Sequence, residues 1–580
     1  MEYEVFFVRE QKKILVQEGI SLLEAQRLAG LQPDAPCGGQ GKCGKCLADL
    51  VWEKGREEVK ACQYRVTSNL RVETREKTRA HAILTEGFQR AIPLNPVIRA
   101  GFITFRKLRL GEALSQWERI LEALKETFGD NMQDLQPDLK LCSSLYDRLG
   151  KTNTWFVVLG DQKILSMTEE KVPVYGAAVD IGTTSVVGYL LDMTTGKTLA
   201  AESRINPQAQ YGADVIMRSD YAMQHGTEIL SGCIRSCLAE ILQALAEDQG
   251  IRTEDIYGVS AVGNTCMHHL LLNISPGSLS HAPYNPAIRQ QLTIPGRDCG
   301  LPIHENGQLI LLPNIAGFVG ADTMGCLLST RPDQSSEMTL MIDIGTNGEM
   351  VLGNKNRLLT CSTAAGPAFE GAKIECGMRG AAGAVDHVSY ENGTFSYTTV
   401  GGGKAVGLCG SGLIDLTAAL LQAGLIDESG YLDLPDGSSR FILVPETESG
   451  NGKPVYLSQK DVREVQLAKA AIAAGIILLC KNMKITLAKI DRVYIAGAFG
   501  NYMDADSACT IGLIPKELRQ KIMPIGNAAG EGAKIAILNR KELLESQALS
   551  QHISFVELAA SPEFQDCFVD QLEFGSEEDN

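Results

Sequence analysis

The sequence predicts a multidomain protein that combines α+β and α/β domains. Its 580 residues are too many for one hydrophobic core, so three or four domains are expected. Two apolar β runs end in the same Asp-Ile-Gly-Thr turn, at Asp180 and at Asp343, and each is followed by a second β run. A cysteine-rich loop lies near two short β runs at the start of the chain. The predicted division is a small sheet domain at 1–78, a linker at 79–98, a small α/β middle domain at 99–172 and a large two-lobed domain at 173–580.

Composition and charge exclude some classes of function. The chain carries 70 Asp and Glu against 54 Lys and Arg, a formal net charge of −16. It lacks the basic footprint expected for binding nucleic acid or an anionic membrane, so a protein or small-molecule partner is favoured. The N-terminus lacks the order of a signal peptide, and no run approaches the roughly 20 apolar residues of a membrane helix. With sixteen cysteines, such a chain is expected in a reducing cytoplasm.

The cysteine loop predicts a metal centre. Strands are expected at 3–8 and 13–16, a helix at 21–29 and another strand at 47–52. Four cysteines, Cys37, Cys43, Cys46 and Cys62, follow the spacing C-x5-C-x2-C-x15-C. The first three lie between the predicted helix and the last predicted strand. Thiolates from one tight loop plus a distant cysteine suit a [2Fe–2S] cluster, and glycines let backbone N–H groups point at its sulfurs. Four cysteines could equally hold a structural zinc ion.

This stretch resembles the β-grasp ferredoxin domain, and the resemblance implies that the four cysteines ligate a [2Fe–2S] cluster. The plant-type spacing is C-x4-C-x2-C, so the first gap here is one residue longer, and the last gap is short. The hairpin and helix before the loop favour the ferredoxin interpretation over zinc.

The next two segments carry no catalytic constellation. Ile92-Pro93-Leu94-Asn95-Pro96 is extended chain, which predicts a tether between the cysteine domain and the rest. Helices are expected at 114–128 and 139–149 and a strand at 155–159, which is a small α/β unit. We expect it to serve as a spacer or as a dimerisation unit.

The two Asp-Ile-Gly-Thr hairpins predict a phosphate site. Glycines at the tips let backbone N–H groups approach an anion, and the threonines add hydroxyl donors. Each aspartate stands where a carboxylate can hold Mg²⁺, directly or through water. Further on, a turn at 407–415 feeds a helix whose first amides can meet a phosphate or ribose, and the β run at 491–496 enters a glycine turn against which adenine can lie.

The ordered motifs resemble the superfamily of acetate and sugar kinases, heat-shock chaperone ATPases and actin, which implies an actin-like, ribonuclease H-like ATPase domain. By this resemblance the first phosphate motif consists of Asp180, Gly182, Thr183 and Thr184. The second consists of Asp343, Gly345, Thr346, Asn347 and Gly348. The remaining expected ATP contacts are Gly410, Ser411 and Gly412 at the helix start and Gly497 and Gly500 in the adenosine motif. Asp180 and Asp343 are the expected catalytic residues.

A ferredoxin-like domain ahead of such an ATPase narrows the resemblance. The whole chain, including N-T-C-M-H-H at 264–269 and T-A-A-G-P-A-F-E-G at 363–371, is similar to the reductive activators of corrinoid proteins. This implies return of Co(II) to Co(I) in a methyltransferase corrinoid, coupled to ATP and Mg²⁺. The implied partners are a corrinoid protein in its Co(II) form and a low-potential electron donor, and the implied state is a homodimer. Ser362 and Thr363 are our candidates for hydroxyls facing the cobalt.

Two alternatives remain open at this stage. The first alternative is an activator that injects electrons into another low-potential acceptor, such as a radical dehydratase. The activators of radical dehydratases share the ATPase fold. Those activators hold a [4Fe–4S] cluster between subunits, and Cys409 lies at about the corresponding loop without an obvious partner cysteine. The other alternative is a small-molecule kinase with a zinc-bearing appendage, which iron and acid-labile sulfide in the protein would exclude.

Overall fold

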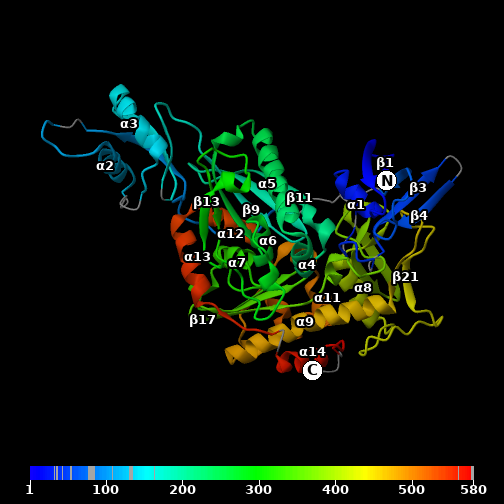
Figure 1. Cartoon of the computed structure of the whole chain (residues 1–580). Helices are drawn as coiled ribbons and strands as arrows, with labels where there is room; N and C mark the ends of the chain where they lie inside the picture. Colours follow the sequence, from blue (N-terminus) through cyan, green and yellow to red (C-terminus); the bar gives the residue numbers. More distant parts are fainter. Residues whose placement is uncertain are drawn as a thin grey trace.

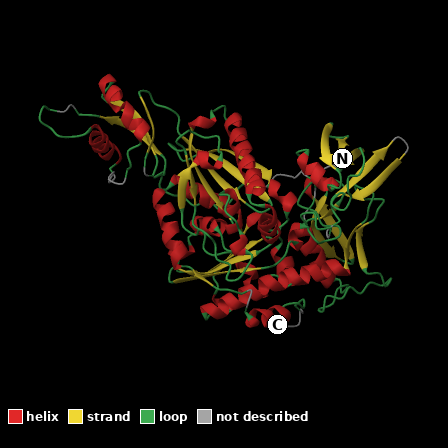
Figure 2. Cartoon of the chain, in the orientation of Figure 1, coloured by secondary structure: helices red, strands yellow, loops and turns green. Residues whose placement is uncertain are grey.

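The structure is a computed structural model that describes most of the chain. The residues outside the description are 32, 34, 36, 42–43, 53–54, 76–84, 107–108, 130–134, 162, 559–560 and 576–580. A large central body carries a small sheet domain at each of two opposite sides (Figure 1). Figure 2 shows that strands lie inside the central body and that helices flank them.

Residues 1–74 form a five-stranded sheet with one helix, which we call the redox domain after the cluster predicted for its cysteines. The strand order is β2-β1-β5-β3-β4, with β1 and β5 parallel and the other pairs antiparallel. The elements are β1 (Glu2–Phe7), β2 (Lys12–Gln17), α1 (Leu22–Leu28), β3 (Leu47–Trp52), β4 (Gly55–Lys60) and β5 (Leu70–Thr74). Leu22 and Leu23 of the helix pack on Val5 and Val72 of the sheet. The cysteine loop therefore lies between α1 and β3, on a fixed core.

Residues 85–98 are bound to the central body along their length. The Phe88 N–H donates to the Ile525 carbonyl at 2.9 Å, and the Val97 N–H donates to the Ile537 carbonyl at 2.9 Å. Val97 and Ile98 are fully buried. The segment is extended, as the prolines predicted, but its described part is fixed to the ATPase body and does not act as a free tether.

The middle domain is a three-stranded antiparallel sheet with two helices. Its elements are β6 (Arg99–Thr104), α2 (Gln116–Phe128), α3 (Leu139–Lys151), β7 (Thr154–Leu159) and β8 (Ile164–Thr168), in the order β6-β7-β8. Ile120 and Leu124 of α2 pack with Trp155 and Val157. Phe156 faces the other way and joins the core of the central body. The helices and the strand expected from sequence are confirmed.

The first lobe is a six-stranded mixed sheet with the order β11-β10-β9-β12-β14-β13. Its strands are β9 (Tyr175–Ile181), β10 (Ser185–Asp192), β11 (Thr198–Ile205), β12 (Ile256–Gly263), β13 (Leu292–Pro295) and β14 (Gln308–Leu311). Its helices are α4 (Val215–His225), α5 (Glu228–Asp248), α6 (Thr265–Leu271) and α7 (Ala321–Thr330). Helix α5 covers β10 and β11.

The second lobe repeats this plan in the sheet β24-β23-β15-β16-β17-β25. Its strands are β15 (Thr339–Ile344), β16 (Gly348–Asn354), β17 (Arg357–Thr363), β23 (Arg492–Ala496), β24 (Ile522–Gly526) and β25 (Ser554–Phe555), and its small sheets add β18 (Ala384–Glu391), β19 (Thr394–Thr399), β20 (Gly407–Leu408), β21 (Arg440–Val444) and β22 (Val455–Ser458). The helices are α8 (Gly410–Gln422), α9 (Gln459–Met483), α10 (Gly497–Tyr502), α11 (Ala505–Thr510), α12 (Ala528–Leu538), α13 (Arg540–His552) and α14 (Pro562–Asp570).

The two large sheets share one topology. In each, an antiparallel hairpin, β9–β10 or β15–β16, is followed by a third antiparallel strand, and a parallel strand, β12 or β23, lies on the far side of the first. Helix α12 comes late in the chain but packs on α7 and on β9 and β12 of the first lobe. The repeat places the two hairpin tips, and so the two Asp-Ile-Gly-Thr turns, in equivalent positions of the two lobes.

Among the described residues, α5 is the helix that is long and apolar enough to span a membrane by length and composition. The sequence prediction that no such run exists did not anticipate it. Leu238, Ile241 and Leu242 on this helix are buried in the core of the first lobe. Packing on the sheet therefore accounts for its apolar character.

Candidate nucleotide site and cluster loop

The two hairpin tips meet at one carboxylate. The Thr184 hydroxyl of the first tip donates to Glu370 Oε2 at 2.7 Å, and the Thr346 hydroxyl of the second tip donates to Glu370 Oε1 at 2.6 Å. The predicted hairpins, β9–β10 and β15–β16, are thus both present and their tips face each other across the lobes. Glu370 belongs to the run T-A-A-G-P-A-F-E-G at 363–371, and the sequence analysis did not single it out.

The first tip is held rigidly from below. Asn206 donates its side-chain amide to the Gly182 carbonyl at 2.8 Å, and Asn264 donates to the Thr183 hydroxyl at 2.9 Å. The fully buried Arg218 donates to the Thr183 carbonyl at 2.5 Å. These three side chains fix the backbone of the turn that was predicted to approach a phosphate.

Three motif glycines lie at places where a side chain does not fit, whereas a Cβ on Gly345 would meet nothing closer than Glu370 Oε1 at 3.6 Å. A Cβ on Gly182 would lie 2.7 Å from the Ser185 carbonyl oxygen, and one on Gly348 would lie 2.8 Å from the Thr363 hydroxyl. Gly497 has φ +83°, and its Cβ would lie 2.9 Å from Asp343 Oδ1. The predicted adenosine turn therefore lies directly beside the second aspartate. Gly500 instead lets α10 pack against Ile495.

Four half-buried carboxyl groups lie beneath the tips. Burial and neighbouring carboxylates raise the pKa of Asp180 and of Asp343 to about 7. Burial raises the pKa of Asp322 to about 6, and burial followed by Asp322 and Asp343 raises the pKa of Glu349 well above its ordinary value. Because the negative charges of neighbouring carboxylates repel one another, a bound cation would stabilise the ionised form of this set.

Mg²⁺ fits the donor set, since hard carboxylate oxygens are the ligands it prefers. Among the described residues, no three His, Cys, Asp or Glu side chains are arranged to hold a metal ion together. Because Mg²⁺ loses water reluctantly, carboxylates of this kind would hold the ion through its water shell. Asp322 and Glu349 were missed by the sequence analysis.

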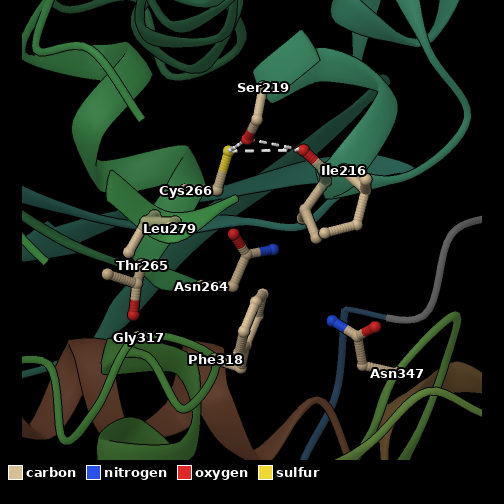
Figure 3. A pocket seen from close by; sticks show the side chains of 10 residues that line it. Ile216, Ser219, Asn264, Thr265, Cys266, Leu279, Gly317, Phe318 and Asn347 are labelled. Atoms are coloured by element: carbon tan, nitrogen blue, oxygen red, sulfur yellow. Dashed lines mark hydrogen bonds between the residues drawn. The ribbon is translucent and has the colours of Figure 1, made fainter. Parts of the chain in front are cut away.

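A small cavity lies between the first lobe and the second hairpin. Its volume is about 10 Å³, enough for about one water molecule. Figure 3 shows that Asn264 and Phe318 line it from the first lobe and that Asn347 approaches from the second hairpin. Ser219 lies 3.5 Å from Cys266 Sγ in its wall. Asn347 thus contributes to the contact between the lobes.

The start of α8 is packed, not open. The missing side chains of Gly410 and Gly412 leave room for the carbonyl groups of Phe369 and Val385. Ser411 is 3% exposed. These residues therefore support the Glu370 loop from behind.

The two hydroxyls proposed to face the cobalt differ in exposure. Thr363 is 2% exposed, and its hydroxyl lies 3.4 Å from the Gly348 carbonyl, so it faces the interior of the lobe. Ser362 is half-buried and pairs with Glu349 across the strands β16 and β17.

The cysteine loop brings thiols together. Cys37 and Cys46 are each 4% exposed, and burial followed by the Cys46 and Cys37 thiols raises the pKa of Cys62 to about 11. Gly39 has φ +96° and its Cβ would lie 3.9 Å from the Cys62 Cβ, so a side chain there would fill the loop. Cys43 lies outside the described residues. The donor set fits a thiolate-ligated cluster, which would displace the thiol protons.

The redox domain is docked on both lobes. Arg27 lies 4.6 Å from the centre of the Tyr211 ring and donates to the Gln210 carbonyl in the first lobe. Lys45 Nζ, in the cysteine loop, donates to the Gly371 carbonyl in the second lobe at 3.3 Å. A Cβ on Gly38 would lie 2.8 Å from the Tyr211 carbonyl oxygen, so the loop backbone itself contacts the ATPase body.

Comparison with known proteins agrees with this organisation. Residues 337–580 match the C-terminal domain of RACo, the ASKHA domain, and residues 175–335 match the RACo middle region. The solved structure of a reductive activator for corrinoid, iron-sulfur protein has 34% identity and a TM-score of 0.75, and the match covers 99% of this chain and 98% of that one. The predicted fold class, with an actin-like ATPase domain, is confirmed.

Two curated relatives are also named as proteins that activate or reduce corrinoid proteins. The corrinoid activation enzyme RamQ of Eubacterium limosum is 36% identical over an alignment of 595 residues, and the match covers 98% of this chain and 99% of RamQ. The Co(II) methylated amine-specific corrinoid protein reductase of Methanosarcina barkeri is 27% identical over an alignment of 433 residues, and the match covers 69% of this chain and 77% of that protein. This chain belongs to the family of corrinoid activation enzymes, the ATP-dependent reductive activators of corrinoid proteins.

Proposed function

We propose that this protein uses MgATP to transfer one electron from a [2Fe–2S] cluster to a corrinoid protein, whose cobalt is thereby reduced from Co(II) to Co(I). The observation that carries the proposal is the docking of the cysteine loop, through Lys45, on the residue next to Glu370. One loop of the second lobe thus contacts both the predicted phosphate hairpins and the redox domain.

In this proposal the chain's own residues divide the work. Thr184 and Thr346 donate to phosphate oxygens, and Asp180 and Asp343 hold the water shell of Mg²⁺. Cys37, Cys43, Cys46 and Cys62 hold the cluster, which supplies a one-electron carrier when bound. Ser362 is the candidate for a hydroxyl that meets the partner.

ATP is needed because the electron transfer runs uphill. Plant-type [2Fe–2S] centres lie near about −400 mV. When the potential of the acceptor is more negative than that of the cluster, the equilibrium constant for one-electron transfer falls about tenfold for every 59 mV of difference. ATP assists only where bound nucleotide favours one conformation or partner complex over another. Closure of the lobes on ATP, linked to docking of the corrinoid protein, is the step we propose.

The partner is proposed to be the corrinoid protein of a methyltransferase system, with a low-potential donor that reduces the cluster. The names of the relatives, which act on methylated amine-specific and iron-sulfur corrinoid proteins, support this class of partner. A homodimer in the cytoplasm is proposed as the working state.

The experiment that tests this proposal is anaerobic. The reduced protein is mixed with a Co(II) corrinoid methyl carrier from the same cell, with and without MgATP, and the visible spectrum of Co(I) is followed. We expect Co(I) only with MgATP, and none with Cys46→Ser. Iron and acid-labile sulfide are measured on the same samples, since zinc in their place would contradict the cluster assignment. An intact cluster without Co(I) from any carrier would contradict the corrinoid acceptor.

The raised carboxyl pKa values predict a pH dependence. Asp180 has a pKa of about 7 in the folded protein against an ordinary value of 3.8, so the folded chain binds the additional proton between these limits. The contribution of Asp180 to the free energy of unfolding therefore falls as pH rises towards 7. We expect the melting temperature of the metal-free protein, relative to Asp180→Asn, to be lower at pH 8 than at pH 6.

Mg²⁺ should reverse this trend, because it binds the deprotonated carboxylates. Adding MgATP should therefore raise the melting temperature of the wild-type protein more at pH 8 than at pH 6. An equal difference between the wild type and Asp180→Asn at both pH values would show that Asp180 does not titrate between them, which would contradict a pKa of about 7.

A further inference from the structure

We propose that Glu370 is the residue through which the γ-phosphate of ATP controls the docking of the redox domain. The Glu370 carboxylate accepts both hydroxyl donors, and in this proposal ATP displaces it and thereby releases the second-lobe contact of the cysteine loop. The inference rests on the proposed ATP site, because it takes Thr184 and Thr346 as phosphate donors.

The first argument is competition for donors. Each oxygen of the Glu370 carboxylate accepts one hydroxyl, Oε1 from Thr346 at 2.6 Å and Oε2 from Thr184 at 2.7 Å. A single carboxylate that spans two lobes takes the place that a tetrahedral anion bound by both tips would need. Two like charges do not share the same pair of donors in a site with this burial, so phosphate and Glu370 exclude each other.

The second argument is the rigidity of the loop that carries Glu370. Gly371 has φ +76° and packs against the Met378 backbone, and the Ala372 N–H donates to the Pro367 carbonyl at 3.1 Å. The Gly366 N–H donates to the Thr346 carbonyl at 2.9 Å. Displacement of the Glu370 side chain is therefore transmitted to the neighbouring backbone, which includes the Gly371 carbonyl.

The third argument is where the redox domain is attached. Lys45 Nζ donates to that same Gly371 carbonyl at 3.3 Å, and Lys45 immediately precedes the ligand candidate Cys46. The first-lobe attachment has the same design: Asn206, which begins the short helical turn Pro207–Tyr211, bonds the Gly182 carbonyl of the first tip. Arg27 stacks on Tyr211 at the end of that turn.

Both contacts of the redox domain are thus one short segment away from a phosphate hairpin. Lobe movement about bound ATP changes the distance between Tyr211 and Gly371, and a rigid domain held at both points cannot follow both. We infer that nucleotide-free protein keeps the cysteine loop docked, and that ATP frees the domain to approach the corrinoid partner.

The test uses the full-length protein with AMPPNP and ADP as probes, by anaerobic calorimetry. Replacing Glu370 by Gln keeps the size of the side chain and removes the charge, and charge-assisted hydrogen bonds are about twice as strong as neutral ones. We expect Glu370→Gln to bind AMPPNP about tenfold more tightly than the wild type does, with ADP affinity unchanged. Glu240→Gln, at an exposed position of α5 in the first lobe, is the matched control and should bind both as the wild type does.

Docking is followed by hydrogen–deuterium exchange of the backbone amides at 207–211 and 370–372. In the wild type, AMPPNP should raise exchange at both segments and ADP should not. Lys45→Met should raise exchange at 370–372 without nucleotide and, because docking and nucleotide binding oppose each other reciprocally, should bind AMPPNP more tightly than the wild type, whereas Lys60→Met, on the exposed end of β4, should change neither.

The outcomes separate this inference from the proposed function. Failure of the wild type to bind any nucleotide would remove the ATP site itself. Normal binding by the wild type with unchanged AMPPNP affinity in Glu370→Gln, or loss of AMPPNP binding in that variant, would overturn the role of Glu370 alone. Exchange at 207–211 and 370–372 that is insensitive to AMPPNP would overturn the control of docking.

Discussion

Replacing Asp343 by Asn should lower the MgATP-dependent rate of Co(I) formation by about 100-fold, the loss typical of a group that orients a metal's ligands. Asp343 lies beside the Gly497 turn and directly opposite Glu349 in the β15–β16 hairpin. It is therefore placed to meet both the ion and the nucleotide, and Asn keeps its shape without the charge. The measurement is the visible spectrum of Co(I) under anaerobic conditions at saturating MgATP.

The same substitution should make the metal-free protein more stable. Burial, Asp322 and Glu370 raise the pKa of Asp343 to about 7, so its charged form destabilises the folded state at pH 8. Asp343→Asn removes that charge, and its melting temperature at pH 8 should equal or exceed that of the wild type. Asp298→Asn, on an exposed side chain, should change neither rate nor stability. A less stable Asp343→Asn protein would mean that lost activity reflects damage to the fold.

Local pattern was enough to predict the parts of the site that are built within one segment. The β15–β16 hairpin required only two apolar runs around a glycine turn, and its tip lies where expected. The same holds for the loop of Cys37 and Cys46, since strand and helix signals bracket it.

Residues brought together by the two lobes could not be predicted in this way. Asp322 begins α7 and reaches the carboxylate group only because α7 packs beneath the first sheet. Glu370 stood in a run noted for its small residues, and its function depends on two hairpins facing each other across the lobes. Glu349 had a signal, because a hairpin closed at Ile344 and Gly348 pairs it with Asp343.

The linker shows a different limit. Proline content correctly predicted extended chain at 92–96, but an extended segment can be free or can be bound along a neighbour. Hydrogen bonds from Phe88 to Ile525 and from Val97 to Ile537 bind it to the second lobe and to α12. The described part of this segment is therefore held against the body and is not a free tether.

A pair of Gly→Ala substitutions should have opposite effects on stability. Gly532 of α12 lies against the backbone of Gly325 of α7, where the two helices cross, and an added Cβ would overlap the Gly325 carbonyl. Gly232 of α5 is exposed, and a Cβ there would meet nothing within 4 Å. Helix propensity alone favours both substitutions by up to about 1 kcal/mol.

Close packing should reverse the sign at Gly532, because backbone on the opposite helix cannot rotate away as a side chain can. Overpacking costs about 1–3 kcal/mol, and α12 is the helix that joins the second half of the chain to the first lobe. We expect Gly532→Ala to lower the melting temperature by about 5 °C and Gly232→Ala to raise it slightly, as measured by calorimetry. Stabilisation by both would show that the α7–α12 crossing is loose enough to admit a methyl group. In that case the two helices can slide past each other, and closure of the lobes on ATP can take place at this crossing.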